Sequence, residues 1–517
     1  MAREPARYRV KGTKLYIRPG QGMQAYEAAG TGRRARFWHA PRVGPNAALE
    51  RSLPALRGRS RQADRNDGMA ASAIDGLATE MVGTGLKPKF RTPDRNLNRE
   101  LARLWADWTD EADADGRLDF YGLQGLLARS VVAGGDAFIR LRLRQPGDMA
   151  TVPLQLQLLE SEFCPDELTM PFAGGLAAGN EISQGVEFNI IGQRVAYWLY
   201  RRHPGDRNGN WFLDSEAKRV PASEVLHCLF PRRPGQIRGE PWLSRALITL
   251  RDLDLFQDAT LKRQQAASMI AGFVTEPADD TFGGDDSQEE DEAESGVLNV
   301  KMEPGTLIGL EPGQEITFNN PPDAGTTYDP FTTWQLRYIA ASIGILYEQL
   351  TGDYTSANDR QYRAAINAFR RRCEMWQFHM LVYQACRPIL WRWLDLAILA
   401  GKIQPRGLSD AELRRVDWIG QKRPYIHPVQ DVQADIAAVR AGFTARADIV
   451  SGQGDDVEDV DERQAQDNAR ADEAGLAHDS DGRRPAKGGA APEPDGGGDG
   501  GRQDEGGEGE QRGRPDA

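Results

Sequence analysis

The sequence predicts a fold of the α+β class, and three patterns carry this prediction. Apolar residues recur at spacings of three and four around Leu101, Leu104, Trp105 and Trp108, as on one face of a helix. Within 136–144, apolar residues instead alternate with arginines, as on the two faces of a strand. Helical and strand patterns occupy separate stretches of the chain, which is typical of α+β proteins.

Two stretches make up the first half of the chain. Residues 46–130 show helical spacing, and residues 131–230 are mostly β. In the β-rich stretch Ile139, Leu141 and Leu143 alternate with arginines, and LQLQL repeats the alternation. Further on, two apolar runs flank Ile191-Gly192-Gln193, which predicts a hairpin.

The second half is predicted to be mainly helical. Pro241 is placed to open a helix of about thirty residues without another Gly or Pro. An acidic run and short apolar runs separated by Pro-Gly pairs follow, and the apolar runs indicate strands. Asp329-Pro330 then opens a second helix that continues to Leu350, and helical spacing returns from Tyr362 to Trp376.

Charge is distributed unevenly along the chain. Residues 1–65 contain 15 Lys or Arg and 4 Asp or Glu, whereas residues 451–517 contain 8 and 19. Residues 1–45 lack periodicity and are predicted to be a basic flexible arm. Residues 466–517 are interpreted as an acidic, Gly-rich disordered tail, because almost nothing beyond about residue 475 can be buried. No signal peptide or membrane span is predicted.

No pattern indicates an enzyme, a cofactor or a metal. The pair Gly401-Lys402 precedes Ile403 rather than Ser or Thr, so a nucleotide-binding P-loop is not predicted. The 4 Cys form no C-x-x-C pair, and the 6 His are scattered without metal-ligand spacing. Glu160 and Glu162 are the best candidates for a catalytic carboxylate pair, but a structural role is favoured. No catalytic residue is therefore expected.

The sequence resembles the lambda-like tailed-phage portal proteins over most of residues 45–465. No single segment is a chemical signature, but the order and spacing of the segments match this family. The segments are RGRSRQADRNDGMAASAIDGLATEMVGTGLKP (57–88), GGDAFIRLRLR (134–144), LQLLESE (156–162), GVEFNIIGQRVAYWLYRRHPGD (185–206), VPASEVLHCLFPRRPGQIRGEPWLSRAL (220–247), YTSANDRQYRAAINAFRRR (354–372) and IHPVQDVQADIAAVRAGFTARADIVSGQGDDVEDV (426–460).

The resemblance implies a ring, usually of twelve subunits, that forms the DNA channel at one capsid vertex. Its implied partners are other copies of the chain, the terminase large subunit, the head-tail adaptor, the major capsid protein and double-stranded DNA. Assembly is expected in the host cytoplasm, and the final location in the virion. The implied parts are a helical and β-rich wing (46–240), a stem helix (241–274), a small α/β clip (275–326), a returning stem helix (327–352), and a tunnel loop, wing helices and helical crown (353–465).

The resemblance also implies two contact regions. A tunnel loop facing DNA would contain Tyr354, Thr355, Ser356, Asn358 and Arg360. The clip would contact terminase and adaptor through acidic residues that belong to a run of nine acids at 279–294, namely Asp285, Asp286, Glu289, Glu290, Asp291 and Glu292.

Two other classes of function stay open. Another structural phage protein, such as an adaptor or capsid subunit, would differ in ring size and central channel. A DNA-processing enzyme would need a nucleotide loop or converging acids, and incubation with ATP and DNA would reveal it. The acidic character of residues 66–450 suits a channel, because DNA must slide through it rather than be gripped.

Overall fold

The structure is a computed structural model. It describes residues 40–145, 147–171, 179–206, 216–269 and 328–476, with a few short pieces elsewhere. The chain divides into two compact units, of which the first comprises Met1–Leu86 and Phe90–Val416 and the second Lys87–Lys89 and Asp417–Ala517. No helix among the described residues is both long and apolar enough to cross a membrane.

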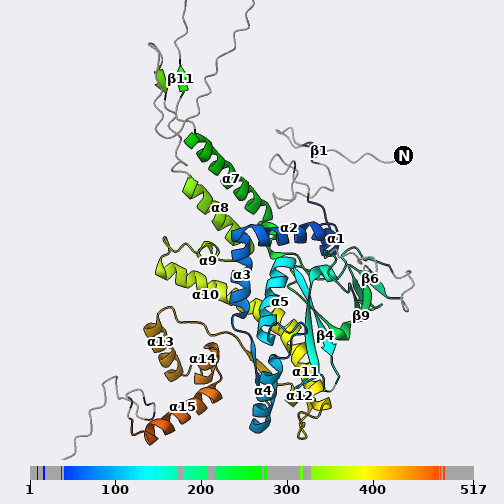
Figure 1. The fold of residues 1–517 in the computed structure, drawn as a ribbon, viewed down its shortest axis with the longest axis vertical. Helices are drawn as coiled ribbons and strands as arrows, with labels where there is room; N and C mark the ends of the chain where they lie inside the picture. The colour runs from blue at the N-terminus through cyan, green and yellow to red at the C-terminus, as the bar shows by residue number, and fades with distance from the viewer. Residues whose placement is uncertain are drawn as a thin grey trace, which may run out of the picture. The chain divides into compact units, whose positions relative to one another are not determined.

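Helices dominate the beginning of the first unit, as predicted (Figure 1). Three of them are capped by an aspartate that accepts backbone N–H groups: Asp67, Asp94 and Asp119. The predicted apolar face is confirmed, because Leu101, Trp105 and Trp108 are buried. The helices are α1 (Pro45–Glu50), α2 (Leu53–Asn66), α3 (Gly68–Val82), α4 (Arg95–Thr109) and α5 (Phe120–Gly134).

Two antiparallel sheets follow the helices. Strands β4 (Asp136–Leu143), β5 (Leu154–Glu160) and β10 (Val225–Leu229) form a sheet in the order β10-β4-β5. The predicted alternation is confirmed, because Leu141 pairs with Leu156 and both are buried, whereas the arginines lie on the other face. The second sheet has four strands, β6 (Glu181–Ser183), β7 (Val186–Phe188), β8 (Arg194–Leu199) and β9 (Lys218–Pro221).

The predicted hairpin is formed by β7 and β8. Asn189 closes it, because its side-chain oxygen accepts the N–H groups of Ile191 and Gln193, and Gly192 has a positive φ of 77°. The two sheets share an apolar core in which Phe138 and Val225 meet Val186, Tyr197 and Val220. Short 3-10 turns, η3 (Ser161–Phe163) and η5 (Ala222–Glu224), follow β5 and β9.

The first long helix starts later than predicted. Pro241 has a ψ of 136° and precedes a 3-10 turn, η6 (Trp242–Arg245), so α7 runs from Leu247 to Met269. At about 1.5 Å per residue its length is roughly 35 Å. The second helix, predicted to continue to Leu350, is also interrupted. Gly344, with a φ of +97°, separates α8 (Tyr328–Ile343) from α9 (Tyr347–Thr351).

A continuous helical run forms much of the last part of the first unit. It consists of α10 (Asp359–Trp376), a π-helix η7 (Gln377–Cys386) and α11 (Arg387–Leu399). The predicted face of α10 is confirmed, since Ile366, Phe369 and Cys373 are buried. The sequence did not indicate the π-helix. A short α12 (Asp410–Leu413) follows, and two small strand pairs, β1 (Tyr8–Arg9) with β2 (Tyr16–Ile17) and β11 (Phe273–Thr275) with β12 (Glu315–Thr317), are also described.

The second unit is mainly helical. Strands β3 (Lys87–Phe90) and β13 (Val416–Ile419) pair, and α13 (Pro428–Arg440), α14 (Arg446–Gly452) and α15 (Val457–Glu473) follow. Helix α15 extends past residue 465, so 466–473 are helical rather than part of the tail. No residue of these three helices is fully buried.

Candidate functional site

The loop between α9 and α10 contains four of the residues that the resemblance assigned to a DNA-facing segment, and the fifth, Arg360, lies in the first turn of α10. Asp353 holds its turn, because its carboxylate accepts the N–H and hydroxyl of Thr355, at 3.0 and 2.6 Å, and the hydroxyl of Tyr347 at 3.0 Å. These hydrogen bonds lower the pKa of the Asp353 carboxyl. The resemblance assigned a DNA-facing role to Thr355 and not to Asp353, and the part that Asp353 plays in fixing the turn is visible only in the structure.

The other residues named for this loop lie in the same exposed segment. Tyr354 is 52% exposed, and its ring meets that of Tyr362 edge to face at a centroid distance of 5.6 Å. Burial and the neighbouring Tyr354 raise the pKa of Tyr362 to about 12, so this phenol is uncharged at neutral pH. Asn358 caps α10 by accepting the N–H of Arg360 at 3.1 Å, and Ser356 and Arg360 are exposed.

The acidic residues assigned to the clip lie outside the described residues. They are Asp285, Asp286, Glu289, Glu290, Asp291 and Glu292.

Glu160 and Glu162 lie close together but are engaged by a shared arginine. Nη1 of Arg61 is 3.0 Å from Glu160, and Nη2 is 3.3 Å from Glu162. Nε2 of His203 is 3.4 Å from Glu160. Burial would raise the pKa of the Glu162 carboxyl, but the charge and hydrogen bonds of Arg61 hold it below its ordinary value. The arrangement is an ion-pair cluster, which fits the structural role favoured from the sequence.

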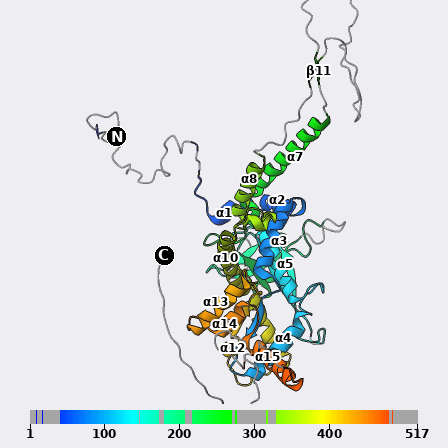
Figure 2. The same ribbon diagram turned by 90° about the vertical axis from the view of Figure 1, so that its left-hand side faces the viewer.

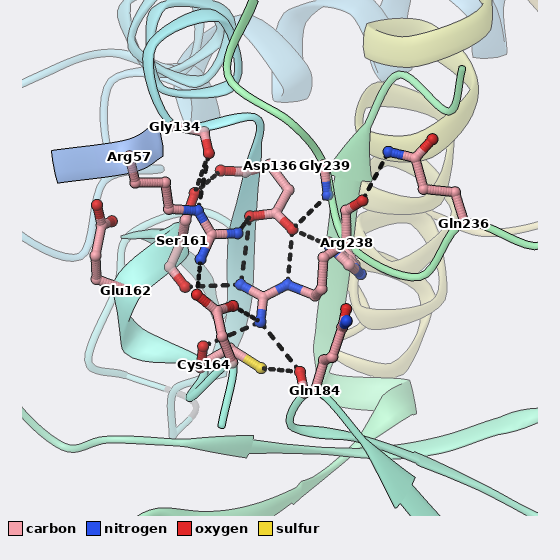
Figure 3. A network of polar contacts seen from close by, with 12 residues as sticks. Arg57, Gly134, Asp136, Ser161, Glu162, Cys164, Gln184, Gln236, Arg238 and Gly239 are labelled. Carbon is pink, nitrogen blue, oxygen red and sulfur yellow. Dashed lines mark hydrogen bonds and ion pairs between the residues drawn. The ribbon is translucent and has the colours of Figure 1, made fainter. Parts of the chain in front are cut away.

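A buried charge network joins the helices to the sheets (Figure 3). Asp136, at the start of β4, is fully buried and lies 2.7 Å from Nε of Arg238 and 3.0 Å from Nη2 of Arg57. Nε2 of His227 is 3.2 Å from the same carboxylate, and the N–H of Gly239 donates to it at 3.0 Å. The Asp136 carboxylate therefore connects α2, β10 and the segment before α7 to the start of β4.

The guanidinium groups of this network are satisfied from several sides. Arg238 donates to the carbonyl oxygens of Ser161 (2.8 Å), Cys164 (3.0 Å) and Gln184 (3.1 Å). A second buried carboxylate, Asp166, forms ion pairs with Arg238 at 2.8 Å and Arg57 at 2.5 Å. Two acids thus balance two arginines, which is what burial of charge requires.

Burial and charge act in opposite directions on the acid at the centre. Burial alone would raise the pKa of the Asp136 carboxyl, but Arg238, Arg57 and His227 hold it well below its ordinary value. For His227 burial dominates and lowers the pKa to about 4, although the hydrogen bond with Asp136 favours the protonated ring. At neutral pH, Asp136 is therefore ionised and His227 neutral.

Two glycines make the network sterically feasible. A Cβ atom on Gly239 would lie 1.9 Å from the carbonyl oxygen of Gly135, so the two backbones cross where no side chain fits. Gly135 precedes Asp136, and Gly239 follows Arg238. This crossing places the segment that leads into α7 directly against the start of β4.

Helices α7 and α8 present apolar side chains to solvent. The two helices lie side by side (Figures 1 and 2), and Phe256 of α7 packs against Tyr328 and Phe331 of α8 at centroid distances of 5.9 and 5.0 Å. Elsewhere on the two helices, Ile248 is 72% and Trp334 is 67% exposed. We call the exposed large apolar residues of this pair the α7–α8 surface: Ile248, Leu255, Phe256, Leu261, Phe331, Trp334 and Tyr338.

Comparison with known proteins decides the family. The family model described as "Phage portal protein, lambda family" matches residues 31–377, which is more than half of the chain. The chain belongs to the lambda family of phage portal proteins.

Relatives of this portal protein are similar over most of their length. The "Probable portal protein" of Halomonas phage phiHAP-1 is 25% identical over 439 residues, covering 81% of each chain. "Portal protein B" of Escherichia phage lambda is 24% identical over 500 residues, covering 87% of this chain and 90% of the relative. A chain in the solved structure "Neck of empty GTA particle computed with C6 symmetry" has 16% identity and a TM-score of 0.44, over 81% of this chain and 97% of that one.

The buried network of this portal protein lies within the matched range but was not predicted from the sequence. The sequence held one hint of this network, since Asp136 in GGDAF and Arg238 in IRGEP each stand beside a glycine near apolar residues. That pattern occurs in many loops. Only the fold shows that Gly135 and Gly239 cross and that Asp136 and Arg238 meet.

Proposed function

We propose that this portal protein forms a closed ring of identical subunits around a DNA channel at one capsid vertex. It acts there as a structural part of the virion rather than as an enzyme, and it docks the terminase motor during packaging and the head-tail adaptor afterwards. The observation that carries the ring is the α7–α8 surface. Exposed aromatic and aliphatic residues on paired helices favour association, because water is excluded when a neighbouring subunit covers them.

A ring explains why one subunit leaves this surface open. Head-to-tail contacts between identical chains close into a ring when each rotates by a fixed angle. Each subunit then covers part of its neighbour's α7–α8 surface, and paired helices repeated around an axis form a rigid wall. In this arrangement the segment from Tyr354 to Arg360 is proposed to face the DNA. The acidic run at 279–294 is proposed to contact the motor and the adaptor.

Assembly of the purified chain tests the ring. Native mass measurement and electron microscopy should show one closed oligomer with a channel wide enough for duplex DNA. Trp334→Glu should shift the protein toward monomers, because a charge would replace an apolar contact. Leu399→Glu is the matched control, since Leu399 is 81% exposed at the end of α11 and its substitution should leave the oligomer unchanged.

Three outcomes would contradict the proposal. Monomers or dimers alone, across a range of concentration and salt, would exclude the ring. A ring without a DNA-sized channel would favour another structural phage protein. Turnover of ATP or cleavage of DNA by the purified chain would favour a DNA-processing enzyme.

A further inference from the structure

Three arginines lie in a row on one face of β4. Arg140 and Arg142 belong to the strand, and Arg144 follows directly after it. The backbone N–H of Arg144 donates to the carbonyl oxygen of Pro153 at 3.0 Å, so the hydrogen-bond pattern between the strands continues to this residue. Residues two apart point to the same face of a strand and are separated by about 6.8 Å. We call these three residues the β4 arginine row.

Among the residues that the structure describes, the hydrogen-bond partners of the row are neutral. Arg142 donates from Nε to the side-chain oxygen of Gln157 at 2.9 Å, and Arg144 donates to that of Gln155 at 2.8 Å. Nε of Arg140 is buried without a hydrogen-bond partner. Across the described part of the chain, no carboxylate lies within ion-pair distance of the row, whereas arginines such as Arg57, Arg129 and Arg219 pair with acids.

The charge of the row is only partly compensated. Burial lowers the pKa of Arg142, and the charges of Arg140 and Arg144 lower it further, while Glu224 acts in the opposite direction. Like charges held on a rigid strand repel one another, and water screens them less when they are partly buried. An anion supplied from outside the chain would relieve this repulsion.

The row is also accessible. At the Phe138 end, this face of the sheet is covered by the four-stranded sheet, since Phe138 packs with Val186 and Tyr197. Further along β4, Arg140 and Arg142 are partly exposed and Arg144 is exposed. The opposite face of this sheet is apolar and packed, so the arginine side chains cannot be accommodated there.

We infer that the β4 arginine row binds an extended acidic segment of a partner protein that carries carboxylates on alternate residues. An extended peptide has the same rise per residue as β4, so its alternate carboxylates match the spacing of the arginines. Each guanidinium can then form charge-assisted hydrogen bonds with one carboxylate. The charge of −12 on the chain opposes a long polyanion such as DNA more than it opposes a short peptide.

Binding by the full-length protein tests spacing and chemistry separately. Fluorescence anisotropy at low salt would compare a labelled peptide of alternating glutamate and threonine, a peptide of the same composition with its glutamates in one block, and a short DNA duplex. The alternating peptide should bind most tightly. Equal binding of the block peptide would overturn the spacing argument, and tighter, row-dependent binding of DNA would assign the row to nucleic acid instead.

Two substitutions locate the binding site. Arg142→Gln and, separately, Arg144→Gln should each weaken binding of the alternating peptide roughly tenfold, because a charge-assisted hydrogen bond is lost. Arg95→Gln is the control, since Arg95 is an exposed arginine on α4 whose loss changes the net charge equally. Arg144 is exposed, so its variant should fold even if Arg142→Gln does not. Unchanged affinity in a folded Arg144→Gln protein would refute the inference.

Discussion

Asp136 shows how much of the fold can depend on one side chain. It accepts hydrogen bonds from Arg57, His227, Arg238 and Gly239, which come from α2, β10 and the segment before α7. Its partners Arg57 and Arg238 are 79 and 102 residues away in the sequence. No local pattern could therefore have predicted the network, because periodicity reports only which residues share a face.

Removing the charge of Asp136 should destabilise the protein strongly. Asp136→Asn would leave Arg57 and Arg238, both buried, with Asp166 as their remaining acid. Breaking a buried ion pair in this way costs about 3–5 kcal/mol, because the cation stays desolvated. Urea unfolding should show a much lower midpoint for this variant. Asp107→Asn, at an exposed position of α4, should unfold like the wild type, and equal midpoints for the two variants would contradict the role of the network.

The lowered pKa of His227 predicts that the protein loses stability in mild acid. Its pKa is about 4 in the folded chain and about 6.5 when unfolded, so the unfolded state binds the proton first as the pH falls. The contribution of neutral His227 is complete above pH 6.5 and is lost progressively toward pH 4, by up to roughly 3 kcal/mol. Unfolding free energies across this range should therefore fall less steeply for His227→Gln. Parallel curves for the two proteins would contradict the prediction.

At the scale of elements, the sequence predicted most helices and strands but not their interruptions. The alternation in β4 and β5 and the apolar faces of α4 and α10 were predicted because each depends on neighbouring residues. Gly344 interrupts the second long helix with a positive φ. A single glycine in a helical pattern does not predict such a break, because many helices tolerate one. Pro241 precedes a 3-10 turn instead of opening α7.

The π-helix depends on contacts that are distant in sequence. Nε2 of Gln377 donates to the carbonyl oxygen of Met81 at 3.1 Å, and the N–H of Leu229 donates to the side chain of Gln384 at 2.9 Å. Gln377 and Gln384 are seven residues apart, and in an α-helix such residues share one face. A π-helix has more residues in each turn, so here the two side chains point in different directions. Gln377 and Gln384 can thus bond to α3 and β10 at the same time.

Replacing Gln384 should weaken the junction between the π-helix and β10. Gln384→Leu leaves the N–H of Leu229 without its acceptor, which costs about 1–3 kcal/mol when the group stays buried. Amide hydrogen exchange at Leu229 should accelerate, and the urea midpoint should fall. Gln361→Leu, at an exposed position of α10, should change neither quantity. Unaltered exchange at Leu229 in Gln384→Leu would show that another group holds the end of β10.

At the scale of the whole molecule, the family was predicted from the order and spacing of short segments, whereas the exposed residues of the two proposed contact surfaces were not. The resemblance over residues 45–465 agrees with the family match over residues 31–377. The two long helices were predicted from the sequence, but which of their apolar residues are exposed became visible only from the fold. The β4 arginine row was visible as an alternation, but only the fold shows that no described carboxylate pairs with it.

The acidic run at 279–294 leads to a prediction about docking. Nine carboxylates within this run repel one another, and their repetition in every subunit of the proposed ring would multiply the negative charge. Exposed complementary charges mainly accelerate encounter with a basic partner surface and change the final affinity less.

Replacing Glu289, Glu290 and Glu292 with Gln and Asp291 with Asn should therefore slow association with the terminase motor. The slowing should be greatest at low salt, because at about 0.15 M ionic strength charges are screened beyond roughly 8 Å. Stopped-flow association at several salt concentrations would measure it, with the oligomer checked by mass. Equal rates at low salt for wild-type and neutralised rings would exclude a recruiting role for the run.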